Sequence, residues 1–297
     1  HDEKHLPSQG SLSDSEFVKM IDWLNKHYRI LSASEYKKSF ESNNLKKTDI
    51  CLSFDDALKC QYDIAVPIME RLGIEAFFFV YSSAFGAEPD PLEIYRFFRT
   101  KYFKKIDEFY ECFFEIVEEK NAAEFSRHRS EYLKLDYLSS FSFYTENDKW
   151  FRYLRDNFLV GEQYKEIMND IMDNRSFDID LAKKDLWMSE TDLVRIESKG
   201  HIIGLHGYSH PTRISKLSRA QQKSEYKKNY DHLSKLLGKP IDVMSHPCGD
   251  YNKTTLNILK EMNIHMGFRS NMSVKDILSP LEIPREDHAN VYKEMNQ

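Results

Sequence analysis

Short apolar runs that end abruptly in acidic or histidine residues constrain the fold of this 297-residue chain more than any other feature. Three such runs cover residues 50–54, 201–205 and 241–244. The first ends in Asp55-Asp56, the second in His206, and the third in Ser245-His246-Pro247. Buried strands of a parallel sheet read as continuous apolar runs, and ligands bind beyond the carboxyl ends of such strands. The sequence therefore predicts a parallel sheet with a functional site at one edge.

Helical patterns alternate with these runs. A helix is expected from about residue 60 to 71, stopped by Gly73, and residues 75–81 read as the next strand. Further helices are expected at 186–198, 219–237 and 254–262. The order strand, helix, strand is a βαβ unit, so the alternation favours an α/β protein whose sheet is either open or closed into a barrel.

Residues 89–184 break this alternation. They lack strand patterns and are rich in Phe, Tyr, Glu and Lys, while segments 106–119 and 162–173 place apolar residues at helical spacing. We expect a helical insertion at 89–184 in a domain formed by residues 1–88 and 185–297. Such an insertion serves either as a structural extension or dimer interface, or as a lid over the strand ends.

Composition narrows the class of protein. The net charge is -6, from 48 acidic and 42 basic residues without a long basic block, which argues against a nucleic-acid partner. The longest apolar run, Ala76–Tyr81, is far short of the roughly 20 residues that a transmembrane helix needs. The 4 cysteines form no C-x-x-C pair, so neither a zinc knuckle nor a disulfide framework is expected. We expect a cytoplasmic protein, with export left open because the chain starts at His1 without a Met.

The polar residues after the strands favour a metal site. Adjacent acids such as Asp55 and Asp56 often only cap a helix, but His206 and His210 are four residues apart and can reach one cation from a single turn. One Asp and two His leave coordination positions open, as in catalytic sites. Zn²⁺ is the leading candidate, and Co²⁺, Ni²⁺, Mn²⁺ and Fe²⁺ suit the same ligands. The alternative is a structural Asp-His-His cluster without a metal.

Two segments carry a resemblance to a known family. Residues 52–56 (LSFDD) and 206–210 (HGYSH) resemble the first and second motifs of the NodB-type polysaccharide deacetylases, or carbohydrate esterase family four. The resemblance implies that Asp55 is the catalytic base. The metal ligands that it implies are Asp56, His206 and His210.

The resemblance spans about residues 11–85 and 186–290. It implies a distorted (β/α) barrel of about seven parallel strands, a metal-dependent N-deacetylation and a carbohydrate substrate. The helical insertion lies outside the matching motifs.

A third segment, residues 245–252 (SHPCGDYN), resembles the motif whose Pro-aromatic-Gly turn walls the substrate groove. In that motif a backbone N–H binds the oxyanion, and Cys248 would supply it here. The residues expected to contact substrate are His246, Pro247 and Tyr251. The best-known members carry Arg where Ser245 stands and an aromatic residue where Cys248 stands, so this chain departs from the pattern.

The last segment, residues 282–288 (EIPREDH), stands where the family has its closing strand and a histidine that acts as the general acid. The resemblance gives the general-acid role to His288, with His246 as a rival. Arg285 is expected either to pair with Asp55 or to orient the substrate. The alternative is a surface cluster of ion pairs without a functional role.

Together these features predict a metal-dependent hydrolase that removes an N-acetyl or similar acyl group from a sugar. The substrate is expected to be a surface polysaccharide or its nucleotide-linked or lipid-linked precursor. A catalytically inactive carbohydrate-binding protein on the same fold is the alternative, suggested by the altered third motif and the insertion. The sequence leaves the oligomeric state open.

Overall fold

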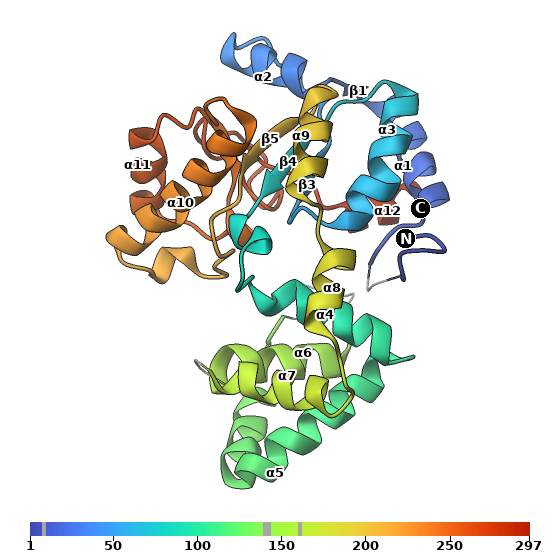
Figure 1. Ribbon diagram of the computed structural model, residues 1–297, viewed down its shortest axis with the longest axis vertical. Coiled ribbons are helices and arrows are strands. Elements are labelled where there is room, and N and C mark those ends of the chain that lie inside the picture. Colours follow the sequence, from blue (N-terminus) through green and yellow to red (C-terminus); the bar gives the residue numbers. More distant parts are fainter. Residues whose placement is uncertain (8–9, 139–143, 160–161) are drawn as a thin grey trace. The chain divides into compact units, whose positions relative to one another are not determined.

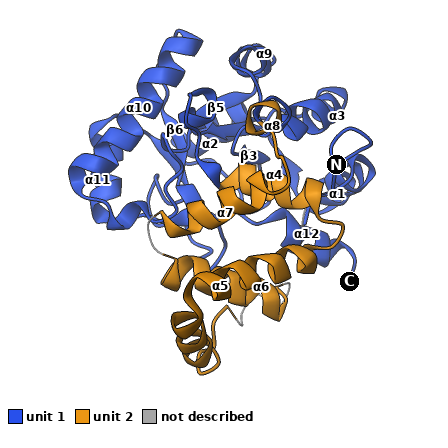
Figure 2. Cartoon of the chain, turned by 60° about the horizontal axis from the view of Figure 1, so that its bottom comes forward, with its two compact units in different colours: residues 1–91, 183–297 blue, residues 92–182 orange. Residues whose placement is uncertain are grey.

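The computed structural model describes residues 1–7, 10–138, 144–159 and 162–297. These residues form two compact units (Figure 2). The first consists of His1–Pro91 and Lys183–Gln297, and the second of Leu92–Ala182. The second unit begins at 92 rather than the expected 89 and ends at 182 rather than 184.

A parallel sheet with strand order β3-β4-β5-β6-β7 forms the centre of the first unit (Figure 1). Its strands are β3 (Ser53–Asp55), β4 (Phe77–Val80), β5 (Ile202–Leu205), β6 (Val243–Ser245) and β7 (Met266–Phe268). A separate pair joins β1 (Arg29–Ile30) to β2 (Asp49–Ile50), also in parallel. The predicted α/β class with parallel strands is confirmed.

The strand number differs from the prediction, because the main sheet has 5 strands rather than about seven. In the described residues β1 and β2 pair only with each other, and the expected closing strand is reduced to one bridge between Phe268 and Ile283. Beyond β7, both backbone and side-chain hydrogen bonds hold the returning chain. The N–H of Gly267 donates to the carbonyl oxygen of Pro280, and the N–H of Arg269 donates to that of Ile283, both at 2.8 Å. The Arg269 guanidinium donates to the carbonyl oxygens of Glu282 and Asp276, both at 3.0 Å.

Close packing of the sheet follows from its residues. All four residues of β4 are buried, as a strand covered on both faces requires. In β5, a Cβ atom on Gly204 would lie 2.7 Å from Cδ1 of Phe79 and 2.9 Å from Cγ2 of Val243, so only glycine lets the neighbouring strands approach this closely. The helix before β4 ends at Gly73 with φ 68°, as predicted.

Helices flank this sheet, with α10 and α11 on one side and α1 and α3 on the other (Figure 1). The longer helices are α1 (Asp14–His27), α2 (Ala33–Glu41), α3 (Val66–Leu72), α9 (Glu190–Ser198), α10 (Arg219–Leu237), α11 (Lys253–Glu261) and α12 (His288–Met295). Short helical turns are η1 (Gln61–Ala65), η2 (Ser82–Phe85), η4 (Ile214–Lys216) and η5 (Pro247–Gly249). Ser13 caps α1 by accepting from the N–H of Glu16.

The described residues of the second unit form helices and no strand. They are α4 (Pro91–Tyr102), α5 (Ile106–Tyr132), α6 (Glu146–Tyr153), η3 (Leu154–Phe158), α7 (Gln163–Asp173) and the first half of α8 (Ile179–Leu186). Aromatic rings dominate their contacts, and the Arg99 guanidinium lies 5.3 and 5.2 Å from the ring centroids of Phe109 and Phe151. Among the described residues of the chain, no helix combines the length and apolarity that crossing a bilayer requires.

Candidate metal centre at the strand ends

The carboxyl ends of β3 and β5 bring the predicted residues together. Asp55 is the last residue of β3, Asp56 follows it, and His206 follows β5. Asp56 adopts a left-handed backbone (φ 75°), and its N–H donates to the carbonyl oxygen of Phe79 at 3.0 Å. This turn separates the directions of two adjacent carboxylates, because one belongs to an extended strand and the other to a reversal of the chain.

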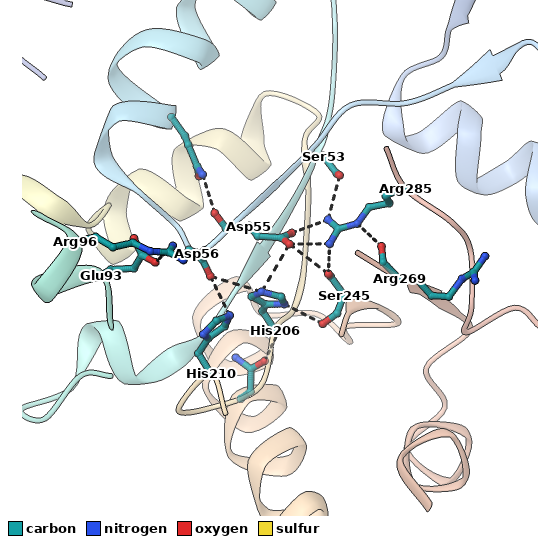
Figure 3. A network of polar contacts seen from close by, with 12 residues as sticks. Ser53, Asp55, Asp56, Glu93, Arg96, His206, His210, Ser245, Arg269 and Arg285 are labelled. Carbon is teal, nitrogen blue, oxygen red and sulfur yellow. Dashed lines mark hydrogen bonds and ion pairs between the residues drawn. The ribbon is translucent and has the colours of Figure 1, made fainter. Parts of the chain in front are cut away.

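Asp56, His206 and His210 form a group whose nearest ligand atoms all lie within 4.8 Å of one another (Figure 3). Oδ1 of Asp56 is 3.5 Å from Nε2 of His206 and 3.4 Å from Nε2 of His210. Ligands about 2.0–2.2 Å from a tetrahedral Zn²⁺ are separated from each other by about 3.3–3.6 Å. The donor atoms and their spacing therefore fit one divalent cation.

Hydrogen bonding sets the orientation of the first histidine. Nδ1 of His206 lies 2.9 Å from the carbonyl oxygen of Ser245, which can only accept, so Nδ1 carries the proton. Nε2 then presents its lone pair towards Asp56. Burial lowers the pKa of His206, while Asp55 opposes this shift, and the neutral ring is the form that binds a metal.

Beside this group lies a bidentate ion pair between Asp55 and Arg285 (Figure 3). Nη1 of Arg285 donates to Oδ1 of Asp55 at 2.8 Å, and Nη2 donates to Oδ2 at 2.7 Å. Oδ2 also lies 3.7 Å from Nε2 of His206. Burial alone would raise the pKa of Asp55, but the charge of Arg285 and the hydrogen bonds that it donates outweigh burial and bring the pKa to about 2. The carboxylate is therefore ionised at neutral pH.

Three further groups fix the Arg285 guanidinium. Nη2 donates to Oγ of Ser245 at 2.7 Å, Nη1 to Oγ of Ser53 at 3.2 Å, and Nε to the carbonyl oxygen of Arg269 at 2.8 Å. Ser245 ends β6, at the position where the resemblance led us to expect an arginine. In this chain a guanidinium reaches the same strand end from residue 285, far along the sequence.

The third motif forms a tight turn next to these strand ends. Pro247 is buried, Cys248 has φ 52° and Gly249 has φ 67°. A Cβ atom on Gly249 would lie 2.1 Å from Oγ of Ser270, so the turn requires glycine there. Pro247 also borders the histidine loop, at 3.3 Å from the place of a Cβ atom on Gly207.

His246 is fully buried, and its Nε2 lies 2.9 Å from the carbonyl oxygen of Leu281. The ring stacks on Tyr251, with centroids 4.2 Å apart, and the Tyr251 hydroxyl donates to Glu282. Burial lowers the pKa of His246 to about 4, so the ring is neutral at pH 7. These contacts favour a structural role for His246 in supporting the turn over a role as a proton donor.

His288 does not join this cluster. The expected closing strand is absent, and His288 is instead the first residue of α12, with a half-exposed side chain. Its Nε2–H donates to the carbonyl oxygen of Gly10 at 2.8 Å, and no contact among the described residues links it to Asp55 or Asp56. Asp287, which caps α12, turns the chain away from the strand ends.

Asn229 and Ser53 contact site residues but were missed from the sequence. Asn229 lies inside the amphipathic pattern of α10 and is fully buried, with its amide oxygen 2.9 Å from the N–H of His206. In the sequence, the signal for Asn229 was a polar residue at a core position of a helix. The partner of such a residue can be identified only once the orientation of the helix is known.

Comparison with known proteins relates part of this chain to one family. Residues 158–267 match the model of the family described as polysaccharide deacetylase. A stretch of 78 residues, 26% of this chain, is 31% identical to the poly-beta-1,6-N-acetyl-D-glucosamine N-deacetylase of Staphylococcus epidermidis. This match spans 27% of that relative's length.

Solved structures resemble the whole fold. IcaB from Ammonifex degensii superposes with a TM-score of 0.57 and 13% identity, covering 98% of this chain and 91% of that one. The Streptococcus pyogenes deacetylase PplD superposes with a TM-score of 0.52 and 18% identity, covering 95% and 82%. At such identities the likeness concerns the fold, and the expected NodB-like architecture is confirmed, with 5 strands in the main sheet.

Proposed function

Because this chain is related in sequence and fold to the NodB-type polysaccharide deacetylases, we propose that it is a metal-dependent hydrolase acting on an N-acylated sugar. The bond broken is the C–N amide bond of an N-acetyl or similar acyl group. The observation that carries the proposal is the convergence of Asp56, His206 and His210 beside the ionised Asp55.

Asp56, His206 and His210 would hold the metal, with Zn²⁺ as the first candidate and Co²⁺, Ni²⁺, Mn²⁺ or Fe²⁺ as alternatives. A divalent ion there would supply Lewis acidity and a water of lowered pKa. The mixed oxygen and nitrogen donors leave coordination positions for solvent and substrate, unlike the four protein ligands of a structural zinc site.

Asp55 would take the proton of the attacking water. Its Oδ2 lies 3.7 Å from Nε2 of His206, so it borders the metal group without belonging to it. Arg285 holds both carboxylate oxygens and keeps them ionised. A carboxylate with a pKa of about 2 is a weak base, so the reaction depends on a water that is itself made acidic.

The turn after β6 would line the substrate. The proposal assigns oxyanion binding to the backbone N–H of Cys248, and the groove wall to Pro247 and Tyr251. Donors of this kind typically contribute about 2.7–4 kcal/mol to transition-state stabilisation. The glycine-dependent turn at Gly249 and the stack of His246 on Tyr251 hold this backbone in place.

Protonation of the leaving amine is the role for which two histidines were considered. His246 is neutral at pH 7 and buried against Leu281, which disfavours it. His288 is accessible to solvent and bonded to Gly10, away from Asp55, so we do not assign it this role, and its substitution tests that choice.

The substrate we propose is a surface polysaccharide or its precursor, by analogy with the polymer named for the Staphylococcus epidermidis relative. A second candidate is a binding protein without activity. It is favoured by Cys248 and Ser245 at positions where the resemblance led us to expect an aromatic residue and an arginine.

One experiment separates these functions. Purified protein is analysed for bound metals and incubated with β-1,6-linked and β-1,4-linked N-acetylglucosamine oligomers and with a nucleotide-linked N-acetyl sugar, and free amine and acetate are measured. Release that stops on chelation and returns with added metal supports the hydrolase. Metal-loaded protein that binds these sugars but releases neither product would establish the binding protein instead.

A further inference from the structure

Helix α10 contacts the histidine loop, residues 206–210, with two side chains one helical turn apart. These are Glu225 and Asn229, which share a helix face because residues four apart lie above one another. Neither side chain belongs to the metal group. Both direct all their described hydrogen bonds towards the loop or the adjacent strand ends.

Asn229 joins the ends of two strands. Its Oδ1 accepts from the N–H of His206 at 2.9 Å, and its Nδ2 donates to the carbonyl oxygen of Val80 at 2.9 Å and to Oγ of Ser82 at 2.7 Å. The side chain is fully buried, so water cannot replace these bonds. The amide has one orientation, because only the oxygen can face an N–H and only the NH₂ can face a carbonyl.

Glu225 binds the middle of the loop. Its Oε2 accepts from the N–H groups of Tyr208 at 3.0 Å and Ser209 at 2.8 Å, and Oε1 accepts from the Ser209 hydroxyl at 3.0 Å. Two consecutive N–H groups can converge on one oxygen only when the backbone curls. The curl is visible in φ values of 75° at Gly207 and 52° at His210, and a histidine in this region needs support from its surroundings.

These contacts fix the loop backbone at His206 and directly before His210. Asn229 fixes the backbone at His206, and Glu225 fixes the residues directly before His210, whose conformation is left-handed. Since the imidazoles must meet one cation at bond lengths defined to a few tenths of an ångström, the loop backbone decides whether they do.

We propose that Glu225 and Asn229 are positioning residues, which hold the two histidines in the geometry that binds a divalent metal; this rests on the function proposed above. Groups that orient metal ligands typically change metal affinity by about 10–100-fold when removed. Neither residue touches the metal or the substrate in this proposal, so their effect passes through the loop.

The test is a metal titration of the chelator-stripped full chain with Co²⁺, followed by its visible absorption, and with Zn²⁺ in competition with a chromophoric chelator. Asn229→Ala and Glu225→Ala are expected to weaken binding by about 10–100-fold and to alter the Co²⁺ spectrum. Both must first show a wild-type far-ultraviolet circular dichroism spectrum.

Two controls come from the same helix. Gln222 is as buried as Asn229 but binds the carbonyl oxygen of Leu217 and the hydroxyl of Thr255, away from the loop. Gln222→Ala should therefore lower thermal stability and leave metal affinity unchanged. Lys223→Ala removes an exposed side chain and should change neither.

Conservative variants sharpen the test. Glu225→Gln keeps an oxygen for the two N–H groups, so it should restore most of the affinity lost in Glu225→Ala. Asn229→Asp places a carboxylate oxygen against the Val80 carbonyl, so it should bind metal as weakly as Asn229→Ala or more weakly. The opposite order would show that charge near the site, rather than positioning, controls affinity, and would overturn the proposal.

Failure of the inference differs from failure of the function. Wild-type affinity and a wild-type Co²⁺ spectrum in both alanine variants would overturn the positioning role while the metal site stands. A wild-type chain that binds neither ion would overturn the metal-dependent function, and this inference with it.

Discussion

Two regions of the first unit were expected to supply residues to the same strand ends, and they behave differently. The ends of β3 and β5 lie in the main sheet, where Asp55 pairs in register with Phe79. The segment of residues 282–288 leaves that sheet after a single bridge at Ile283. The first region delivers all of its expected residues to the site, and the second delivers Arg285 but not His288.

The difference shows where motif spacing carries over between related chains. A strand in a ladder has one register, so a residue at its end has a determined position. A segment that leaves the ladder after a single bridge can change direction within three residues. Arg285 is anchored to Asp55, Ser245 and the carbonyl of Arg269, whereas Asp287 starts a helix that carries His288 away.

The largest effect is expected at the sheet ends. The double variant His206→Ala/His210→Ala should lose bound metal and reduce kcat/KM by on the order of 10³-fold or more, since metal activation contributes several kcal/mol. Elemental analysis and acetate release measure both quantities. His201→Ala is the control, because His201 is buried at the start of the same strand and binds the N–H of Ala76. If the double variant retained wild-type metal content, the ligand assignment would be wrong.

The next effect separates catalysis from metal binding. Asp55→Asn should lower kcat by about 10²–10⁴-fold while metal content stays at the wild-type level, because the side chain no longer accepts a proton. Arg285 then loses its carboxylate partner, and since the pair is partly exposed a loss of about 1–3 kcal/mol in unfolding free energy is expected. Unchanged turnover would remove Asp55 from the proton transfer.

The ion pair also predicts an acid limit of stability for the metal-free protein. The folded-state pKa of Asp55, about 2, is below its value in an unfolded chain, so its contribution is complete above about pH 4 and is lost as the pH falls towards 2. In Arg285→Met the lowering of the Asp55 pKa should be smaller, because the charge of Arg285 is removed. Urea unfolding of both proteins between pH 2 and pH 7 should therefore show their difference shrinking towards the acid end. A difference independent of pH would contradict this role of Arg285.

Arg285→Lys tests the anchored half of the C-terminal segment. A lysine cannot donate two parallel hydrogen bonds to both oxygens of the Asp55 carboxylate, so kcat should fall by about tenfold. A metal titration of the same variant should give the wild-type affinity. Equal kcat values for the two proteins would mean that charge alone, without the bidentate geometry, is sufficient.

The smallest effect is expected at His288, in the part of the C-terminal segment that makes no contact with the described residues of the site. His288→Ala should change kcat/KM by less than about threefold, as for other exposed residues outside a site. The pH profile of kcat/KM in the same variant is the second measurement. A fall of about 10²-fold together with loss of its alkaline limb would restore His288 as the general acid and would require the segment to move on substrate binding.

Much of the site could be predicted because its signals are local. Asp55-Asp56 and His206-Gly207-Tyr208-Ser209-His210 each directly follow an apolar run, and parallel strands place their carboxyl ends at one edge. The helix bounds of α10 and the stop at Gly73 were predicted for similar reasons, since periodicity and capping are short-range properties.

The remaining parts depend on contacts between distant residues. That Arg285 meets Ser245 requires the chain beyond β7 to return to β6. The return of the chain beside β7 involves Arg269, whose Nε donates to the carbonyl oxygen of Glu282 at 3.0 Å. Neither contact has a periodic signal in the sequence.

By itself, the sequence determined the class of fold, the pair of strand ends that meet, and the residue types available to bind a cation, because apolar periodicity and short motifs act within a few residues. Only the tertiary structure decided which of the outlying polar groups reach those strand ends. It brought in Arg285 and Asn229 and left out His288, because burial and hydrogen-bond geometry are set by packing between segments that the linear order keeps far apart.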